Sequence, residues 1–194
     1  MSLIKGCLGS FRRRVIIKIL IFIAILNFKI RKYAFGFDNA CNFFRSVSSP
    51  CIIPILKNEG ASIGSYCSID TGISIHNCKG FENLRIGNNS HVGKNIFFDL
   101  RDQIEIGDNS IVSMGCTLLT HVDVTPSRLT KQVKTHQAPV IISSHAYLGC
   151  NVTVLSGVKI GHSSVIAAGS LVRTSVEKET LVAGVPAVFK SSIK

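Results

Sequence analysis

Aliphatic residues recur every six positions in the second half of the chain. The longest series runs through Ile142, Leu148, Val154, Ile160, Ile166 and Val172, and shorter series lie upstream at Ile63/Ile69/Ile75, Ile86/Val92/Phe98 and Ile106/Val112/Leu118. A half-buried strand repeats every two residues and a helix about every 3.6, so neither element explains this spacing. A sustained period of six is typical of a parallel β-helix, in which short strands turn corners and stack on earlier copies of themselves. We therefore predict an all-β coil with about three hexads in each turn.

The hexad pattern stops between His121 and Val140. This stretch contains two prolines and three basic residues and matches no hexad. A loop of about 20 residues inside a compact repeat is uncommon and is usually functional or disordered. We divide the chain into an N-terminal helical segment with its lead-in, residues 1–60, and a hexapeptide-repeat domain, residues 61–190, which is interrupted by the loop 121–140. Pro50 and Pro54 argue against a long element within residues 33–60.

Residues 1–32 are both basic and apolar. They carry eight Lys and Arg and no acidic residue, and Lys18 and Lys29 bracket only ten uncharged residues. A helix that spans a bilayer needs about 20 apolar residues, so a transmembrane helix is disfavoured. No cleavage site of the signal-peptide kind follows closely.

Two interpretations of this segment stay open. One is a helix that packs on the open end of the coil. The other is an interfacial helix, residues 11–32, with its apolar side in the headgroup region and its bases on anionic lipid. Both leave the body of the protein cytoplasmic, and the second places it peripherally at the inner membrane face.

Composition narrows the classes of partner. The formal net charge is +11, which suits a polyanionic ligand, an anionic membrane or nucleic acid. No helix-turn-helix, zinc-finger or RNA-binding signature is present, so we expect no nucleic-acid partner. The spacings of the seven cysteines fit neither a disulfide framework nor a zinc site. We therefore expect a reduced cytoplasmic protein that holds no metal.

Four short segments follow one another in the order seen in a known family. They are residues 147–150 (YLGC), 155–161 (LSGVKIG), 166–172 (IAAGSLV) and 183–187 (AGVPA). Over residues 60–190 the chain resembles the hexapeptide-repeat acyltransferases, and most closely the sugar O-acetyltransferases of the maltose/galactoside and polysaccharide-modifying branches. Leu119-Thr120-His121, with Pro126 after it, is similar to the catalytic histidine region of that family.

The resemblance implies a left-handed parallel β-helix that assembles as a homotrimer. Acetyl-CoA would lie in the groove between neighbouring subunits as co-substrate, and the hydroxyl of a sugar or glycan acceptor would approach His121. An alcohol is a poor nucleophile until a base takes its proton, and imidazole, with an unperturbed pKa near 6.5, is well matched to that task. The implied catalytic residue is therefore His121, acting as general base.

The resemblance also implies the cofactor-binding residues. Small residues, Gly149, Cys150 and Ala168, would let the pantetheine arm of acetyl-CoA approach the backbone. Arg173, Thr174 and Lys190 would meet its nucleotide phosphates. The chain departs from the family pattern at Cys150, where Ser or Gly is usual, at Tyr147, where Trp is common, and at Val188, where a basic residue is often found.

Asn95 and Asp99 are candidate contacts of the acceptor. Both lie in the turn of the coil that precedes the turn of His121. A satisfied turn is an equally good interpretation of each. For His136 and His145 we expect surface or corner positions, and for His76, His91 and His162 corner positions.

The sequence thus predicts an acetyl-CoA-dependent O-acetyltransferase that acts on a sugar hydroxyl in surface polysaccharide biosynthesis. The apolar, basic N-terminus motivates the polysaccharide branch, because acceptors there are often lipid-linked. The near alternative is a small-molecule (xenobiotic) acetyltransferase, and a non-catalytic β-helix scaffold is another. A zinc carbonic anhydrase on the same coil would need three converging histidines, two of them close in sequence. The first histidine after His121 is His136, so the sequence disfavours this class of enzyme.

Overall fold

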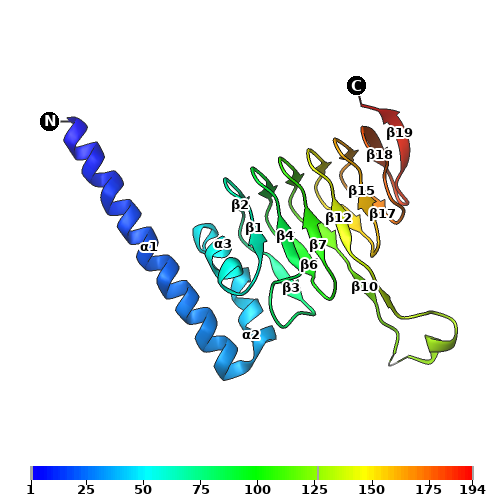
Figure 1. Ribbon diagram of the computed structural model, residues 1–194, viewed down its shortest axis with the longest axis horizontal. Coiled ribbons are helices and arrows are strands. Elements are labelled where there is room, and N and C mark those ends of the chain that lie inside the picture. The colour runs from blue at the N-terminus through cyan, green and yellow to red at the C-terminus, as the bar shows by residue number, and fades with distance from the viewer. Residues whose placement is uncertain (1, 126, 194) are drawn as a thin grey trace.

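The molecule is a parallel β-helix whose N-terminal end is covered by helices (Figure 1). The computed structural model describes residues 2–125 and 127–193, and side chains from Arg12 onward. The helices are α1 (Ser2–Phe35), α2 (Phe37–Cys41), the 3₁₀ helix η1 (Asn42–Arg45) and α3 (Ser49–Asn58). The coil follows and occupies most of the remaining chain.

Three sheets form the walls of the coil, and each turn adds one strand to each sheet. The first sheet contains β1 (Ser62–Ile63), β4 (Leu84–Ile86), β7 (Ile104–Ile106), β12 (Val140–Ile142) and β15 (Lys159–Ile160). The second contains β2 (Ser68–Ile69), β5 (His91–Val92), β8 (Ile111–Val112), β13 (Tyr147–Leu148), β16 (Val165–Ile166), β18 (Thr180–Ala183) and β19 (Val188–Ser192). The third contains β3 (Ser74–His76), β6 (Phe97–Asp99), β9 (Thr117–Leu118), β14 (Thr153–Val154) and β17 (Leu171–Val172).

The hexad residues fill the inside of the coil. Leu148 is buried and pairs in register with Val112 below it and Ile166 above it. Val154 is buried between Leu118 and Val172 in the same way. Stacked aliphatic side chains of similar size remove their surface from water at every level, which is the main stabilising term of such a fold. The predicted left-handed β-helix of hexapeptide repeats, with an N-terminal helical segment and an interrupting loop, is confirmed.

Extra residues enter the coil along one edge. Ile142 pairs with Ile160, which is one turn of three hexads, but Ile63 pairs with Ile86, Ile86 with Ile106 and Ile106 with Ile142. The added residues fall between the third sheet of one turn and the first sheet of the next, at residues 77–83, 100–103 and 119–139. Because these insertions occur on successive turns, they lie side by side and can build a common site.

The longest insertion, which contains nearly all of the loop predicted at 121–140, forms an arm. At its base β10 (His121–Val122) pairs antiparallel with β11 (His136–Gln137). A 3₁₀ helix, η2, spans Arg128–Lys131 farther out. The arm extends away from the coil (Figure 1), and the side chains of Arg128, Lys131 and Lys134 are exposed on it.

One face of α1 is packed against α2, η1 and α3, which together form a helical cap on the coil. Phe28 is buried in an aromatic cluster with Phe37, Phe44 and Phe81, with ring centroids 5.1 to 6.0 Å apart. Phe81 belongs to the coil, so this cluster joins the helices to the first turn. The packing interpretation of the N-terminal segment thus holds for one side of α1. Among the described residues, no helix has a segment that is both long and apolar enough to cross a bilayer.

Pro50 and Pro54 do not prevent a helix from forming. Both prolines lie in α3, a helix of ten residues. Pro50 occupies the first turn, where its missing N–H would have had no partner in the helix, and Pro54 removes a single hydrogen bond. The helix also buries Ile52, Ile55 and Leu56, and tertiary burial of an apolar face outweighs a local propensity of this size.

Candidate active site

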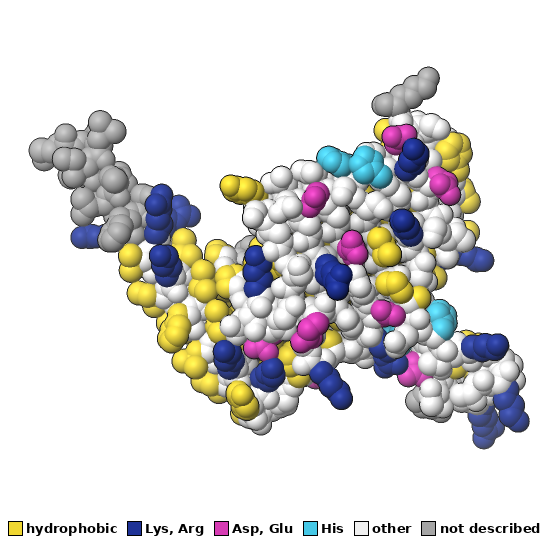
Figure 2. Space-filling model, in the orientation of Figure 1, with side chains coloured by type: hydrophobic (Ala, Val, Ile, Leu, Met, Phe, Trp, Pro, Cys, Tyr) yellow, Lys and Arg dark blue, Asp and Glu magenta, His cyan; other side chains and the backbone are white. Residues whose placement is uncertain are grey.

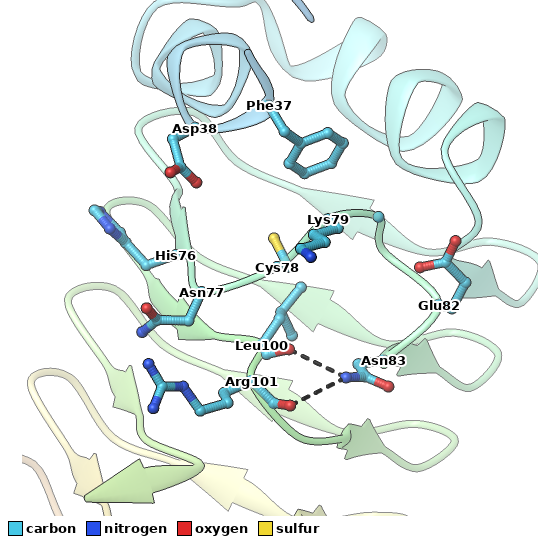
Figure 3. A pocket seen from close by; sticks show the side chains of 11 residues that line it. Phe37, Asp38, His76, Asn77, Cys78, Lys79, Glu82, Asn83, Leu100 and Arg101 are labelled. Carbon is cyan, nitrogen blue, oxygen red and sulfur yellow. Dashed lines mark hydrogen bonds between the residues drawn. The ribbon is translucent and has the colours of Figure 1, made fainter. Parts of the chain in front are cut away.

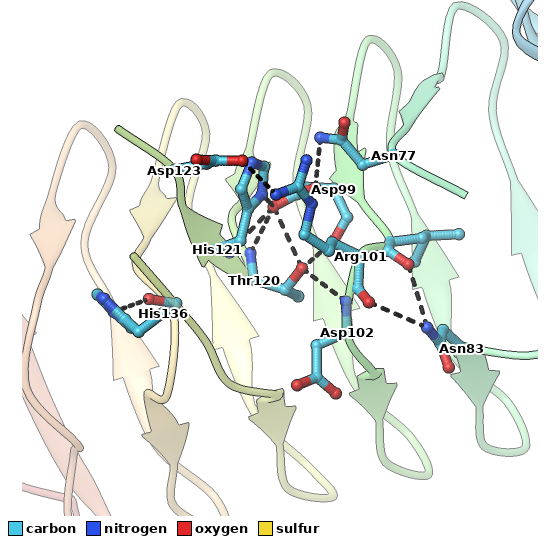
Figure 4. A network of polar contacts seen from close by, with 11 residues as sticks. Asn77, Asn83, Asp99, Arg101, Asp102, Thr120, His121, Asp123 and His136 are labelled. Atoms are coloured by element: carbon cyan, nitrogen blue, oxygen red, sulfur yellow. Dashed lines mark hydrogen bonds and ion pairs between the residues drawn. The ribbon is translucent and has the colours of Figure 1, made fainter. Parts of the chain in front are cut away.

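His121 lies where the coil gives way to the arm, as the first residue of β10. Its side chain is 19% exposed, and its Nδ1 lies 2.5 Å from Oδ2 of Asp99 (Figure 4). An ionised carboxylate can only accept hydrogen bonds, so Nδ1 donates and carries the proton. In the neutral imidazole, Nε2 then bears the lone pair and is the nitrogen that can take a proton from a ligand.

Asp99 is held on all sides by the protein. It is the last residue of β6 and is completely buried. Its Oδ2 also accepts the backbone N–H groups of Thr120 (2.9 Å) and His121 (3.1 Å), and its Oδ1 accepts the amide of Asn77 (2.8 Å). The sequence analysis proposed Asp99 as an acceptor contact, but the structure directs this carboxylate to His121.

These contacts keep Asp99 ionised. Burial by itself would raise the pKa of Asp99, but hydrogen bonds from Asn77, His121 and the N–H of Thr120 outweigh it and lower the pKa below its usual value. A carboxylate that stays charged at neutral pH orients the imidazole ring and stabilises the imidazolium that forms when Nε2 takes a proton.

The neighbouring insertion braces this pair. The hydroxyl of Thr120, which is buried, donates to the carbonyl of Asp99 (2.8 Å) and accepts the N–H of Asp102 (3.0 Å). Arg101 forms an ion pair with Asp123 at 2.9 Å, just beyond His121 in the arm. Hydrogen bonds from Thr125 and then the guanidinium of Arg101 hold the pKa of Asp123 well below its usual range. The start of the arm is therefore tied to the preceding turn.

A cavity of about 700 Å³ opens along the same edge (Figure 3). It lies between α2 and the insertions at 77–83 and 100–103, and it shares Asn77 and Arg101 with the network around His121. Its lining combines the ring of Phe37 with charged and amide side chains: Asp38, Lys79, Glu82, Asn83 and Arg101. Hydrogen-bonding side chains outnumber the apolar side chains Phe37, Cys78 and Leu100 in this lining, which suits a ligand rich in hydroxyl groups.

The structure places Gly149, Cys150 and Ala168 at a different corner, where the second sheet passes to the third. Gly149 directly follows β13 and precedes the turn at Cys150, and Gly169 donates its N–H to the carbonyl of Cys150 in the turn below. A Cβ on Gly149 would lie 2.6 Å from the backbone nitrogen of Ala168, so the two turns can approach this closely only with glycine. A Cβ on Gly169 would meet nothing within 4 Å, and Ala168 is exposed. Open space beside small residues fits a slender ligand that runs along the backbone.

The other predicted residues are spread around the coil. Arg173 and Thr174 are exposed and follow β17, on the same edge as His121 but nearer the C-terminal end. Lys190 is exposed on β19, which pairs antiparallel with β18. Asn95 lies at the corner of Cys150 rather than beside His121, and its amide oxygen packs over Gly72. Within one chain, then, Asp99 and His121 come together and the remaining predicted residues do not join them.

Of the other histidines, His145 and His162 lie at corners as predicted, but His76 ends strand β3 and His91 begins strand β5, so the corner prediction is wrong for these two. His145 and His162 lie side by side at the corner between the first and second sheets, with ring centroids 5.1 Å apart and ring planes tilted by 56°. His136, in the arm, is exposed and lies 2.9 Å from the hydroxyl of Ser156. Among the residues described, no group of three or more His, Cys, Asp or Glu side chains is placed to hold a metal ion.

Comparison with known proteins agrees with this architecture. The family described as "Hexapeptide repeat of succinyl-transferase" matches residues 83–120 and 139–173, on either side of the arm. A hexapeptide-repeat acetyltransferase from Vibrio cholerae O1 biovar eltor, solved with acetyl-CoA, superposes with a TM-score of 0.69 over 90% of this chain and 87% of that one, at 22% identity.

Two curated relatives are galactoside O-acetyltransferases. The chain is 31% identical to that of Escherichia coli (strain K12) over 106 residues, which cover 52% of each protein. It is 28% identical to that of Lactococcus lactis subsp. lactis (strain IL1403) over 139 residues, 72% of this chain and 66% of the relative. The aligned segments thus span half to two thirds of these relatives' length. Over these segments the chain is similar to hexapeptide-repeat acyltransferases, and sugar O-acetyltransferases are among its relatives.

The roles of Asn77 and Thr120, and the contact between Asp99 and His121, were not predicted from the sequence. The signal that could have found them is the hexad register. Phe98 and Leu118 occupy the same position in successive series, so Asp99 had to lie beside the residues that follow Leu118. Asn77 was harder to predict, because it is the first residue of the insertion 77–83. That insertion does not follow the hexad pattern, so its position relative to the neighbouring turns could not be inferred.

Proposed function

We propose that this protein is an acetyl-CoA-dependent O-acetyltransferase that acts on a sugar hydroxyl. The observation that carries the proposal is the buried carboxylate of Asp99 on Nδ1 of His121. A buried anion is costly to maintain unless it is fully hydrogen-bonded, and here its bonds fix the tautomer and direction of one histidine. That arrangement is what a general base requires.

The chemistry follows from this geometry. Acetyl-CoA supplies an activated acetyl group as a thioester. Nε2 of His121 takes the proton of the acceptor hydroxyl as its oxygen bonds to the thioester carbonyl carbon. The C–S bond then breaks, and the imidazolium returns the proton to the departing sulfur, so His121 ends the cycle neutral. Asp99 remains ionised throughout and stabilises the imidazolium.

The separation of His121 from Gly149, Cys150 and Ala168 supports a homotrimer. A slender cofactor held along the corner of Cys150 in one chain would reach His121 of a neighbour when three coils pack side by side. The exposed bases Arg173 and Lys190 then offer positive charge for its phosphates. On this proposal each site belongs to two subunits.

The cavity beside Asn77 and Arg101 is the proposed acceptor site. Its polar lining favours a sugar over an apolar xenobiotic, which is the second candidate acceptor. A role in surface polysaccharide biosynthesis agrees with the sugar-modifying relatives, and it remains a prediction together with the cytoplasmic location.

The test is release of free thiol from acetyl-CoA in the presence of sugars, nucleotide sugars and lipid-linked glycans, with a tube lacking acceptor as control. Acceptor-dependent release with a glycan supports the proposal and names the substrate class. Release with small apolar alcohols or amines alone favours the xenobiotic alternative. Failure to bind acetyl-CoA, measured by calorimetry, would overturn the enzyme proposal and favour a scaffold.

A further inference from the structure

Helix α1 carries two apolar stripes on opposite faces. The inner stripe packs on the helical cap and consists of Ile21, Ala24, Ile25 and Phe28. The outer stripe follows the same helical spacing and consists of Val15, Ile19, Phe22, Ile23, Leu26 and Ile30. The side chains of the outer stripe are 41% to 69% exposed. A helix that is apolar all round is normally buried on all sides, so the outer stripe lacks a cover in the isolated chain.

Basic side chains border the outer stripe on both flanks. Lys18 and Lys29 lie three helical turns apart and so occupy one flank, while Arg13 and Arg31 lie five turns apart on the other. The sequence has no acidic residue before Asp38. In Figure 2 hydrophobic side chains cover the outer side of α1, and dark blue side chains gather toward its N-terminal end. The surface is therefore an apolar strip between two lines of positive charge.

This combination selects one kind of partner. A second copy of the helix would bring the flanking bases of both copies together, and like charges in contact oppose such pairing. An anionic bilayer accepts the apolar strip at the boundary between headgroups and acyl chains and pairs the flanking bases with phosphate groups. The ten uncharged residues between Lys18 and Lys29 are too few to span the bilayer, so the helix would lie in the plane of the surface.

We propose that the outer stripe of α1, Val15 to Ile30, binds the surface of an anionic membrane. The inner stripe holds the same helix on the coil, so the whole molecule is carried at a fixed orientation. The cavity that shares Asn77 and Arg101 with the network around His121 is also lined by Phe37 and Asp38 of α2, which begins directly after α1. This orientation keeps the acceptor cavity near the bilayer. A glycan carried on a lipid would be found there, an inference that rests on the proposed function.

The proposal is tested by flotation of the full chain with vesicles of phosphatidylcholine alone and of phosphatidylcholine with roughly one third phosphatidylglycerol. We expect binding at least tenfold tighter to the anionic vesicles, and weaker binding when salt rises from about 0.1 M to about 0.5 M. The double variant Phe22→Asp/Leu26→Asp should lose at least tenfold in binding. The double variant Lys18→Ala/Lys29→Ala should lose the preference for anionic lipid.

Phe189→Asp is the matched control, because Phe189 is 61% exposed and Phe22 is 69% exposed, and Phe189 lies on β19 at the other end of the molecule. It should bind vesicles like the wild type. Equal binding by the wild type and the Phe22/Leu26 variant, or no binding by the wild type, would overturn the proposal. A change in oligomer mass of that variant by light scattering, without vesicle binding by the wild type, would instead assign the stripe to contact between copies. No arm of the assay uses acetyl-CoA, so its outcome is independent of the transferase proposal.

Discussion

At the scale of single residues, the site depends on Asp99. Its two oxygens face donors from the turn before it and the turn after it, Asn77 on one side and Thr120 and His121 on the other. It is completely buried, so a substitution there reaches a ligand only through His121. Asp99 is therefore a positioning residue, and its effect should be visible both in stability and in catalysis.

The lowered pKa of Asp99 predicts a dependence of stability on pH. Because the folded pKa lies below the unfolded value of about 3.9, the ionised carboxylate stabilises the fold above that value, and this contribution is lost as pH falls through the folded pKa. Asp99→Asn should lower the free energy of unfolding at pH 7, and the difference from the wild type should shrink toward pH 3. Urea titrations across this range measure it. A difference that is constant with pH would contradict the role of the charge.

Two cysteines on adjacent turns allow the cofactor groove to be probed. Burial raises the pKa of the Cys116 thiol to about 11, so it should resist iodoacetamide at pH 8 while the protein is folded. Cys150 is partly exposed and should react. We expect acetyl-CoA to protect Cys150 and to leave the reaction of Cys67, which is also partly exposed, unchanged. Peptide mass spectrometry reads each site, and equal labelling of Cys150 with and without acetyl-CoA would place the cofactor elsewhere.

At the scale of elements, the coil and an N-terminal helix could be predicted, but α3 and the contacts that hold the helices together could not. The hexad pattern recurs on every turn of the coil. The positions of Leu148 and Val154 in it therefore predicted both which strands share a sheet and how those strands align. The cap has no repeat. Its stability comes from Phe28, Phe44 and Phe81, which are far apart in sequence, and this burial let α3 form despite Pro54. The site was half predicted for the same reason, since His121 ends a hexad series and Asn77 lies in an insertion.

The aromatic cluster should therefore hold the cap on the coil. Phe81 is completely buried against three other phenylalanine rings, so Phe81→Ala should lower the free energy of unfolding by about 3–5 kcal/mol. Phe189→Ala, at a position 61% exposed, should change it by less than about 0.5 kcal/mol. Chemical denaturation of both variants makes the comparison. Similar losses at the two positions would contradict a cap that is fixed by this cluster.

At the scale of the whole molecule, a single chain keeps His121 on a different edge of the coil from Gly149, Cys150 and Ala168. A site shared between subunits predicts complementation. His121→Ala and Ala168→Trp should each be inactive alone, the first for lack of a base and the second because the indole fills the open space beside Gly169. If the two variants assemble at random in equal amounts, about one quarter of the sites would pair an intact His121 from one subunit with an intact Ala168 from its neighbour and regain activity. Light scattering should give three times the chain mass of 21.0 kDa. Absence of any regain in mixed trimers would place each site within one chain.

The central claim is that His121, held by Asp99, is the base for acetyl transfer, and its most direct test is the turnover number of three proteins in the thiol-release assay. With a saturating acceptor, His121→Ala should lose at least about a hundredfold in kcat, and Asp99→Asn about tenfold or more, because an amide cannot stabilise the imidazolium. Acetyl-CoA affinity should stay the same in all three. Turnover by His121→Ala within a few-fold of the wild type, with acetyl-CoA still bound, would contradict the account.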